Sequence, residues 1–196
     1  MSAFNKKQSR GFSLIEVLVA VGILAVGLMA VAALITRTLK DTARSREMSL
    51  AALLASEKLE DLNRWPAVDP HVAVAPGATA GSLAADTTAN VVVGGVATTV
   101  AYFDDIVEGQ TPGFFSETVS GIDPVSGGVI YTTTTHAPDG TVTTTVSGAA
   151  PVGSSFKRRW TIEGDQPVAG VRQITVFVTN QDPAGAVTFQ MSTVRP

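Results

Sequence analysis

The longest apolar run of the chain lies near its N-terminus. Between Phe12 and Ile35 the sequence contains one charged side chain, Glu16. A helix rises about 1.5 Å per residue, so a helix of this length crosses the roughly 30 Å hydrocarbon core of a bilayer. We therefore expect residues 12–35 to form a transmembrane helix.

The helical pattern continues after this run, but polar residues now lie between the apolar ones. No proline interrupts residues 36–65, and Pro66 follows directly. Apolar residues recur at steps of three and four, which lays a stripe along one face of a helix. This stripe consists of Met48, Ala52, Ala55, Leu59 and Leu62, widened by Leu50, Leu53 and Leu54. We predict an amphipathic continuation of the helix that packs on a sheet and ends at Pro66.

The next ninety residues, 66–155, have a composition typical of short strands and loops. They are rich in Ala, Gly, Thr, Val and Pro and poor in charge, so no second long helix is expected. A hairpin is predicted from Val129 to Val146, because two β-prone runs flank the turn-forming residues Pro138 to Gly140.

Residues 156–196 contain three strand-like runs separated by GDQPVAG and QDPAG, which predicts an antiparallel meander. Alternate positions place one apolar set on a single face, where it buries the helix stripe. This set is Trp160, Ile162, Ile174, Val176, Val178, Val187, Phe189 and Met191. The expected fold class is α+β, with a long N-terminal helix whose second half packs on a C-terminal antiparallel sheet.

Composition limits the chemistry that the chain offers. The net charge is −3 with only 14 Lys and Arg residues, so no basic field favours nucleic acid as a partner. There is no cysteine, which excludes disulfides, thiol catalysis and cysteine metal ligands. No cofactor is expected.

Candidate catalytic residues are few. His71 and His136 are the only histidines, and neither lies in a metal or catalytic motif, so both are interpreted as surface or loop histidines. Asp104, Asp105 and Glu108 offer oxygen ligands of the kind that Ca²⁺ uses, but without the spacing of an EF-hand. The chain is not expected to be an enzyme.

Lys157, Arg158 and Arg159 form the one compact basic run after the apolar segment. Charges at the edge of a sheet discourage aggregation, and we favour this interpretation. The alternative is that the run meets an acidic patch of a neighbouring subunit, or DNA phosphates.

The residues before the apolar run predict its orientation. Lys6, Lys7 and Arg10 are positive and no acid accompanies them, so the N-terminus is expected in the cytoplasm and the bulk of the chain outside. An ionised Glu16 at bilayer depth costs about 2.5–3.5 kcal/mol and needs a partner. A secretory signal peptide has its small-residue cleavage site after the apolar region, whereas Gly11 precedes it.

The sequence GFSLIEVL, behind its basic leader, resembles the class III signal of type IV prepilins and pseudopilins. The resemblance implies that a prepilin peptidase removes residues 1–11 by cutting between Gly11 and Phe12, and methylates the new N-terminus at Phe12. It also implies that Glu16 pairs with the N-terminal amine of a neighbouring subunit in the filament. The alternative is an ordinary single-span anchor or an uncleaved signal peptide, with Glu16 near the interface.

The three C-terminal runs, with Gly22 and the Gly27-Leu28 pair, resemble the PilV family of minor pilins and the related minor pseudopilins. This implies a minor pilin that is held in the inner membrane with its C-terminal domain in the periplasm, and then enters a surface pilus at low stoichiometry to initiate or modify assembly. The implied partners are the prepilin peptidase, other minor and major pilins, the inner-membrane assembly platform and, before assembly, membrane lipid.

Two alternatives to this function stay open from the sequence. One is a minor pseudopilin of a type II secretion system. The other is a tip adhesin or DNA-binding minor pilin whose contacts are made by residues 66–155.

Overall fold

A computed structural model describes residues 13–108, 115–150, 155–181 and 186–196. The chain divides into two compact units, residues 1–45 and residues 46–196. Gly11 and Phe12, the two residues of the expected cleavage site, lie outside the described residues.

Helix α1 runs from Leu14 to Arg64 without a break, as the absence of proline predicts. Its C-terminal end is held by Arg195, whose Nη1 donates to the carbonyl oxygens of Asn63 and Trp65. A cation at this position also complements the negative end of the helix dipole.

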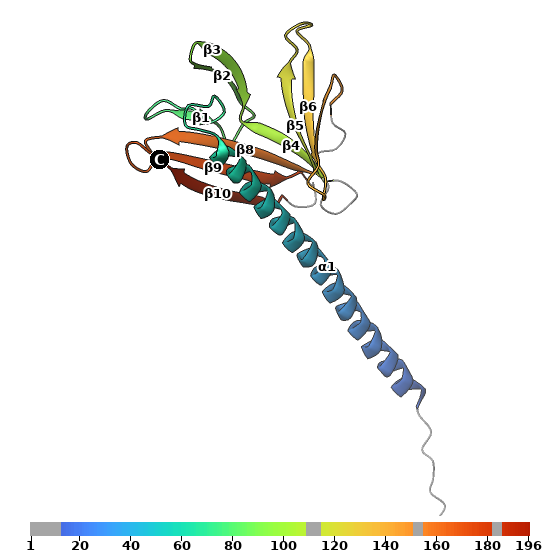
Figure 1. Cartoon of the computed structure of the whole chain (residues 1–196). Helices are drawn as coiled ribbons and strands as arrows, with labels where there is room; N and C mark the ends of the chain where they lie inside the picture. The colour runs from blue at the N-terminus through green and yellow to red at the C-terminus, as the bar shows by residue number, and fades with distance from the viewer. Residues whose placement is uncertain (1–12, 109–114, 151–154, 182–185) are drawn as a thin grey trace, which may run out of the picture. The chain divides into compact units, whose positions relative to one another are not determined.

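The described residues of the second unit form ten strands (Figure 1). They are β1 (Thr79–Gly81), β2 (Thr88–Val93), β3 (Val96–Ala101), β4 (Phe103–Glu108), β5 (Phe115–Ile122), β6 (Val129–His136), β7 (Val142–Ser147), β8 (Phe156–Gly164), β9 (Arg172–Asn180) and β10 (Thr188–Arg195). The main sheet has the order β10-β9-β8-β4-β5-β6-β7, with β1 added to β8, while β2 and β3 form a separate hairpin. The pairs are antiparallel throughout.

Both predicted β units are confirmed. Strands β8, β9 and β10 pair in sequence order as a meander, and β6 and β7 form the predicted hairpin. Between the helix and the meander the described residues contain short strands and loops but no second helix.

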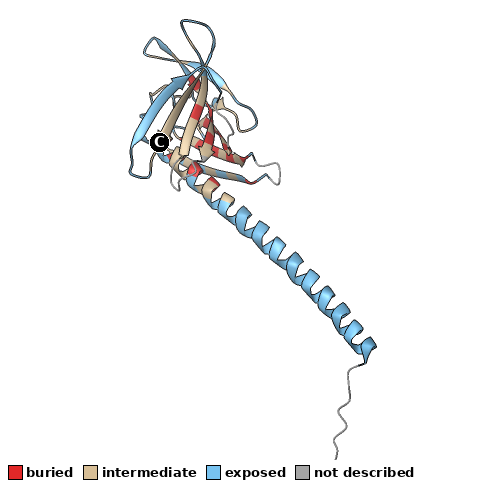
Figure 2. Cartoon of the chain, turned by 90° about the vertical axis from the view of Figure 1, so that its right-hand side faces the viewer, coloured by how far each residue is buried: buried red, intermediate tan, exposed pale blue. Residues whose placement is uncertain are grey.

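The core lies where α1 from Arg46 onward packs on the sheet, which gives the α+β arrangement that the sequence predicts. Figure 2 shows the buried positions concentrated on the inner strands and on the last turns of α1. The predicted meander face is there. Its residues Trp160, Ile162, Ile174, Val176, Val178 and Val187 are buried, and Phe189 and Met191 pack against the core cluster that contains the first five.

The predicted helix stripe is only partly right. The buried residues of α1 are Ala51, Leu54, Ala55, Leu59 and Leu62. Leu53 is 63% exposed and Met48 is 37% exposed, so these two do not belong to the core. The last turns of α1 therefore bury a narrower face, centred on Leu54, Ala55 and Leu59, than the sequence pattern indicated.

One glycine is required by close packing. Gly81, at the end of β1, has a φ of 83° and is paired with Thr161 of the neighbouring strand β8. A Cβ atom at this position would collide with the carbonyl oxygen of Trp160. The short strand β1 can therefore pair with β8 in this way only with glycine here.

Candidate assembly segment and buried ion cluster

The first described part of α1 exposes almost only apolar side chains. Every residue from Ser13 to Arg46 is exposed. The large apolar side chains among them, each at least 50% exposed, are Leu14, Ile15, Val17, Leu18, Val19, Val21, Ile23, Leu24, Val26, Leu28, Met29, Val31, Leu34, Ile35 and Leu39. Burying one such side chain is worth about 1.5–3 kcal/mol, so this surface favours an apolar environment.

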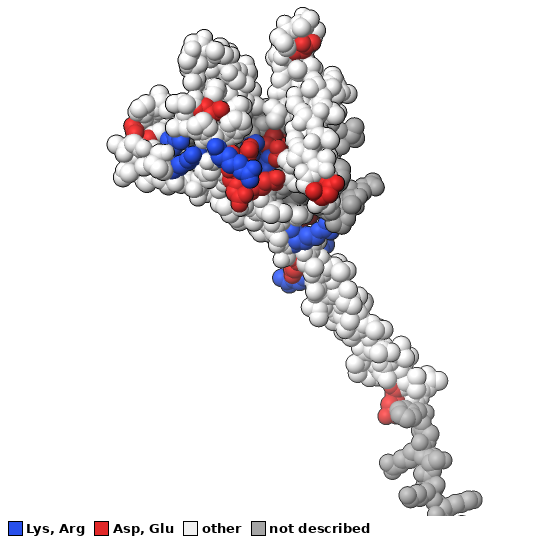
Figure 3. Space-filling model, viewed as in Figure 1, with Lys and Arg blue, Asp and Glu red and all other residues white. Residues whose placement is uncertain are grey.

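By length and composition, α1 is the one helix among the described residues that could cross a membrane. Figure 3 shows the contrast in charge: its first part is almost free of charged atoms, whereas acidic and basic atoms lie side by side over the second unit. This is consistent with a segment that anchors the chain in a membrane. We call residues 14–39 the assembly segment.

Glu16 lies in the first turn of α1 and interrupts the apolar surface of the assembly segment. Its backbone nitrogen donates to the carbonyl oxygen of Ser13 at 3.0 Å, and that of Val17 donates to the same oxygen at 3.2 Å. The helix is therefore already formed at Glu16. A carboxylate near the N-terminus of a helix is favoured by the helix dipole, but in an apolar environment it still needs a cationic partner.

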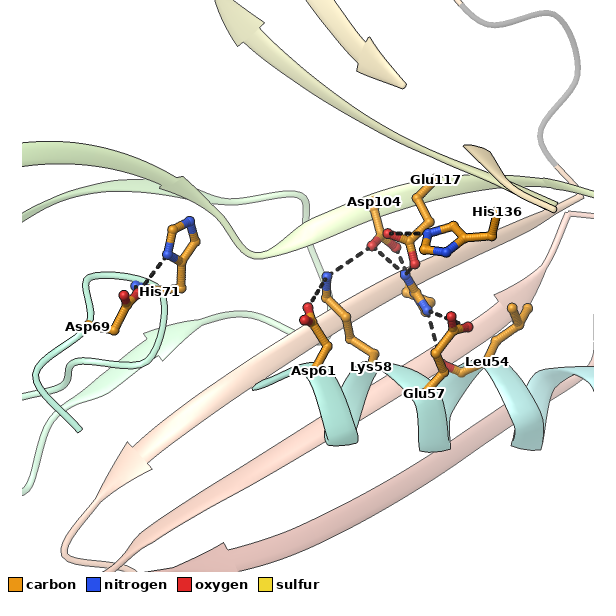
Figure 4. Close-up of polar contacts among 10 residues, drawn as sticks. Leu54, Glu57, Lys58, Asp61, Asp69, His71, Asp104, Glu117 and His136 are labelled. Carbon is orange, nitrogen blue, oxygen red and sulfur yellow. Dashed lines mark hydrogen bonds and ion pairs between the residues drawn. The ribbon is translucent and has the colours of Figure 1, made fainter. Parts of the chain in front are cut away.

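The second unit contains a cluster of charges that sequence reasoning missed. Arg158 of β8 is fully buried, and it donates to both carboxylate oxygens of Asp104 on β4, at 2.9 and 2.7 Å. It also donates to Glu117 of β5 and, at 3.0 Å, to the carbonyl oxygen of Leu54 on α1. Glu57 of α1 lies 4.0 Å away (Figure 4). One arginine thus joins the helix to three strands.

Lys58 extends this cluster along the helix. Its ammonium lies 3.5 Å from Asp104 and 3.6 Å from Asp61, and 4.4 Å from the centre of the Trp160 ring. The lysine therefore adds a second cation to the buried Asp104 carboxylate and covers the face of a core tryptophan.

The environment shifts the pKa values of Asp104 and Glu57 in opposite directions. Burial alone would raise the pKa of Asp104, but the charges of Arg158 and Lys58 outweigh it and lower the pKa below its usual value. Burial raises the pKa of Glu57; Arg158 opposes this shift, whereas the charge of Glu117 adds to it. Asp104 is therefore a well-compensated anion and Glu57 is not. We call Glu57, Lys58, Asp61, Asp104, Glu117 and Arg158 the ion cluster.

The interpretation of Lys157 to Arg159 as charges at a sheet edge is wrong. Strand β8 lies inside the sheet, between β9 and β4, and Arg158 is buried. Lys157 and Arg159 point to the other face, where both bind Asp86 and Lys157 also lies 3.2 Å from Asp105. All three cations are thus held by carboxylates of the same chain.

Two of the three carboxylates considered for calcium, those of Asp104 and Asp105, do not lie together. Asp104 and Asp105 are neighbours in a strand, so their side chains face opposite sides of the sheet. Asp104 binds Arg158, and Asp105 lies near Lys157. The side chain of Glu108 lies outside the described residues.

The two histidines differ from each other. His71 is an exposed loop residue whose Nδ1 lies 2.7 Å from Asp69 Oδ1, and its ring stacks on Trp65. His136 is instead the last residue of β6, and its half-buried ring stacks on Phe115. The interpretation as a surface or loop residue is therefore right for His71 and wrong for His136.

The comparison with protein families bears on the N-terminal segment. Residues 6–32 match the family model described as "Prokaryotic N-terminal methylation motif". The matched segment includes Gly11, Phe12 and Glu16 and the first part of the assembly segment. The chain thus carries a class III prepilin signal ahead of an exposed apolar helix.

This match, over residues 6–32, supports a relation to the type IV pilin and pseudopilin superfamily. It implies processing by a prepilin peptidase and assembly with pilin-type partners, and proteins of this kind are typically structural. The searches of curated proteins and of solved structures gave no match. The similarity to this superfamily therefore rests on residues 6–32.

Proposed function

We propose that this chain is a minor pilin of a type IV pilus, similar to the PilV family, which enters the filament at low stoichiometry and initiates or modifies its assembly. The observation that carries the proposal is the prepilin motif at residues 6–32, followed by a helix whose first part exposes apolar side chains. Such a surface needs lipid before assembly and other apolar helices after it.

The proposal gives three residues separate roles. Gly11 is the residue after which the prepilin peptidase cuts, and Phe12 becomes the methylated N-terminal residue. Glu16 pairs with the N-terminal amine of a neighbouring subunit. In apolar surroundings such a pair is strong and is favourable only in good geometry, so it fixes the axial register of adjacent helices.

The second unit has a different role in this proposal. Its sheet and ion cluster hold the helix from Arg46 onward in one position, because Arg158 and Lys58 join it to β4, β5 and β8. The unit is carried in the periplasm before assembly and on the cell surface afterwards. Its partners are other minor and major pilins and the assembly platform of the inner membrane.

The direct test is a substitution at the cleavage site. We expect Gly11→Val to block processing, so that the full-length precursor accumulates in the membrane and is absent from sheared filaments. Gly22→Ala is the matched control, because a Cβ atom at Gly22 meets nothing within 4 Å. Normal processing of Gly11→Val would contradict the proposal.

A minor pseudopilin of a type II secretion system is the second candidate, because the motif matched at residues 6–32 belongs to the superfamily that contains both classes. Deletion of the gene distinguishes them. Loss of surface pili with normal protein secretion supports the minor pilin. Normal pili with loss of secretion supports the pseudopilin.

A further inference from the structure

Three metal-ligating side chains from different elements converge beside Arg158. They are Glu57 of α1, Glu117 of β5 and His136 of β6, and each offers a ligand atom within 4.8 Å of the other two. All three are half-buried, so the position is sheltered yet reachable from solvent. Figure 4 shows the His136 ring facing the carboxylate of Glu117.

The side chain of His136 offers a nitrogen atom that could bind a metal ion. Its Nε2 atom is buried, and among the described residues it has no hydrogen-bond partner. The nearest carboxylate oxygen, Glu117 Oε2, lies 3.9 Å away, which is beyond hydrogen-bond distance. Stacking of the ring on Phe115, with 4.6 Å between centroids and 6° between planes, fixes its direction. A buried polar atom without a partner is destabilising, and a metal ion would satisfy it.

The charges around His136 give a second and independent reason to expect a cation here. The ion cluster contains four carboxylates, on Glu57, Asp61, Asp104 and Glu117, against two cations, Lys58 and Arg158. The formal charges of these six side chains sum to −2, which one divalent cation balances.

The other face of β8 shows that this chain balances such clusters elsewhere. There Lys157 and Arg159 lie against Asp86 and Asp105, so that two cations meet two carboxylates. The excess of negative charge is thus a property of the cluster beside His136.

We propose that Glu57, Glu117 and His136 bind one divalent metal ion, and that this ion fastens α1 to β5 and β6. An imidazole nitrogen with two carboxylates suits Zn²⁺, whereas Ca²⁺ and Mg²⁺ prefer oxygen ligands alone. Arg158 binds Oε1 of Glu117 and so leaves Oε2 toward the site. Hydrogen bonds of this kind orient metal ligands and are part of the site.

Zinc binding is tested on the full-length chain in detergent, with no histidine tag. We expect one Zn²⁺ per chain by elemental analysis, and a rise in the midpoint of thermal unfolding when ZnCl₂ is added, because ligand binding to the folded state stabilises it. Equal concentrations of CaCl₂ or MgCl₂ are expected to produce a much smaller rise.

The chain offers a matched pair of variants, because it has only two histidines. His136→Ala is expected to weaken Zn²⁺ binding by at least about tenfold and to abolish the rise in the unfolding midpoint, since even residues that only orient ligands are worth 10–100-fold. His71→Ala is expected to behave as the wild type.

Glu57→Gln gives a readout that keeps the His136 ring and its stacking intact. This side chain is 35% exposed, so the substitution is compatible with folding. We again expect weaker binding of Zn²⁺, and loss of the visible absorption of Co²⁺ bound in its place. A wild type that binds no Zn²⁺, or a His136→Ala variant that binds it equally well, overturns the metal site. The proposed pilin function does not depend on this result.

Discussion

The two units of this chain distribute their side chains in opposite ways. The assembly segment exposes Leu, Ile and Val residues that a folded domain normally buries, whereas the second unit buries Arg158 and Asp104, which a domain normally exposes. The first unit therefore depends on apolar partners outside the chain. The second has a core of its own and supplies the partners for its buried charges.

Substitution of the buried Arg158 tests whether the second unit depends on its internal ion pairs, and it has the largest expected effect on stability. Arg158→Met leaves Asp104 and Glu117 without their common cation, and such a break costs about 3–5 kcal/mol. Urea unfolding followed by tryptophan fluorescence measures it, because both tryptophans lie in the second unit. The control is Arg159→Met, which removes the partly exposed ion pair between Arg159 and Asp86. That pair is worth under about 1 kcal/mol. Equal losses for the two variants would contradict the role given to Arg158.

Truncation of a buried and of an exposed leucine of α1 tests which face of the helix packs in the core. Leu59 is 5% exposed, so Leu59→Ala is expected to lower the free energy of unfolding by about 2–5 kcal/mol. Leu53 lies on the same helix but is 63% exposed, and Leu53→Ala is expected to change it by no more than about 0.5 kcal/mol. The same fluorescence assay compares them, and a larger loss for Leu53→Ala would refute the assigned face.

A charge placed in the assembly segment tests whether its exposed apolar surface needs an apolar environment. Leu24→Arg is expected to cost about 2.5–3.5 kcal/mol for insertion into a bilayer, which shifts the chain from the membrane fraction to the soluble or degraded fraction. Leu24→Ala is the control, and urea unfolding of the second unit is expected to be unchanged in both. Wild-type membrane partitioning of Leu24→Arg would show that this surface is not lipid-facing.

Lowering the pH is expected to destabilise the second unit through its buried ion pairs, with a smaller effect than the substitutions above. The pKa of Asp104 is lower in the folded chain than in the unfolded chain, so the unfolded chain takes up the proton first as pH falls. The contribution of Asp104 to stability is thus complete above about pH 4, its unfolded pKa, and is lost as pH falls toward its folded pKa.

The urea midpoint measured from pH 7 to pH 3 tests this dependence. We expect Asp104→Asn to have a lower midpoint at pH 7 and a shallower decline below about pH 4 than the wild type. Asp41→Asn, in the first unit, is expected to decline like the wild type. A decline in Asp104→Asn as steep as that of the wild type would assign the acid sensitivity to other groups.

Local patterns in the sequence were sufficient for the elements but not for the ion cluster. The uninterrupted helix, the hairpin β6-β7 and the meander follow from periodicity and turn residues. The pairing of β8 with β4 joins residues 50 to 56 positions apart, and no local pattern predicts it. That pairing puts β8 inside the sheet, which is why Lys157 to Arg159 were wrongly placed at an edge.

One signal for the buried arginine was nevertheless present. In a strand, Arg158 has the same parity as Phe156, Trp160 and Ile162, so it shares their face, and that face is buried. A charged residue on an apolar face requires a partner of opposite charge. Glu57, Glu117 and His136 had no comparable signal, since they come together only through the sheet order and the packing of α1.

The central proposal is that this chain is a processed pilin, and its N-terminus tests this most directly. We would measure the intact mass and the N-terminal sequence of the protein from sheared surface filaments and from the membrane fraction of the same cells. The account predicts a chain that begins at N-methylated Phe12 in both fractions, with only a small share in the filaments. A chain that begins at Met1 and stays in the membrane would contradict it.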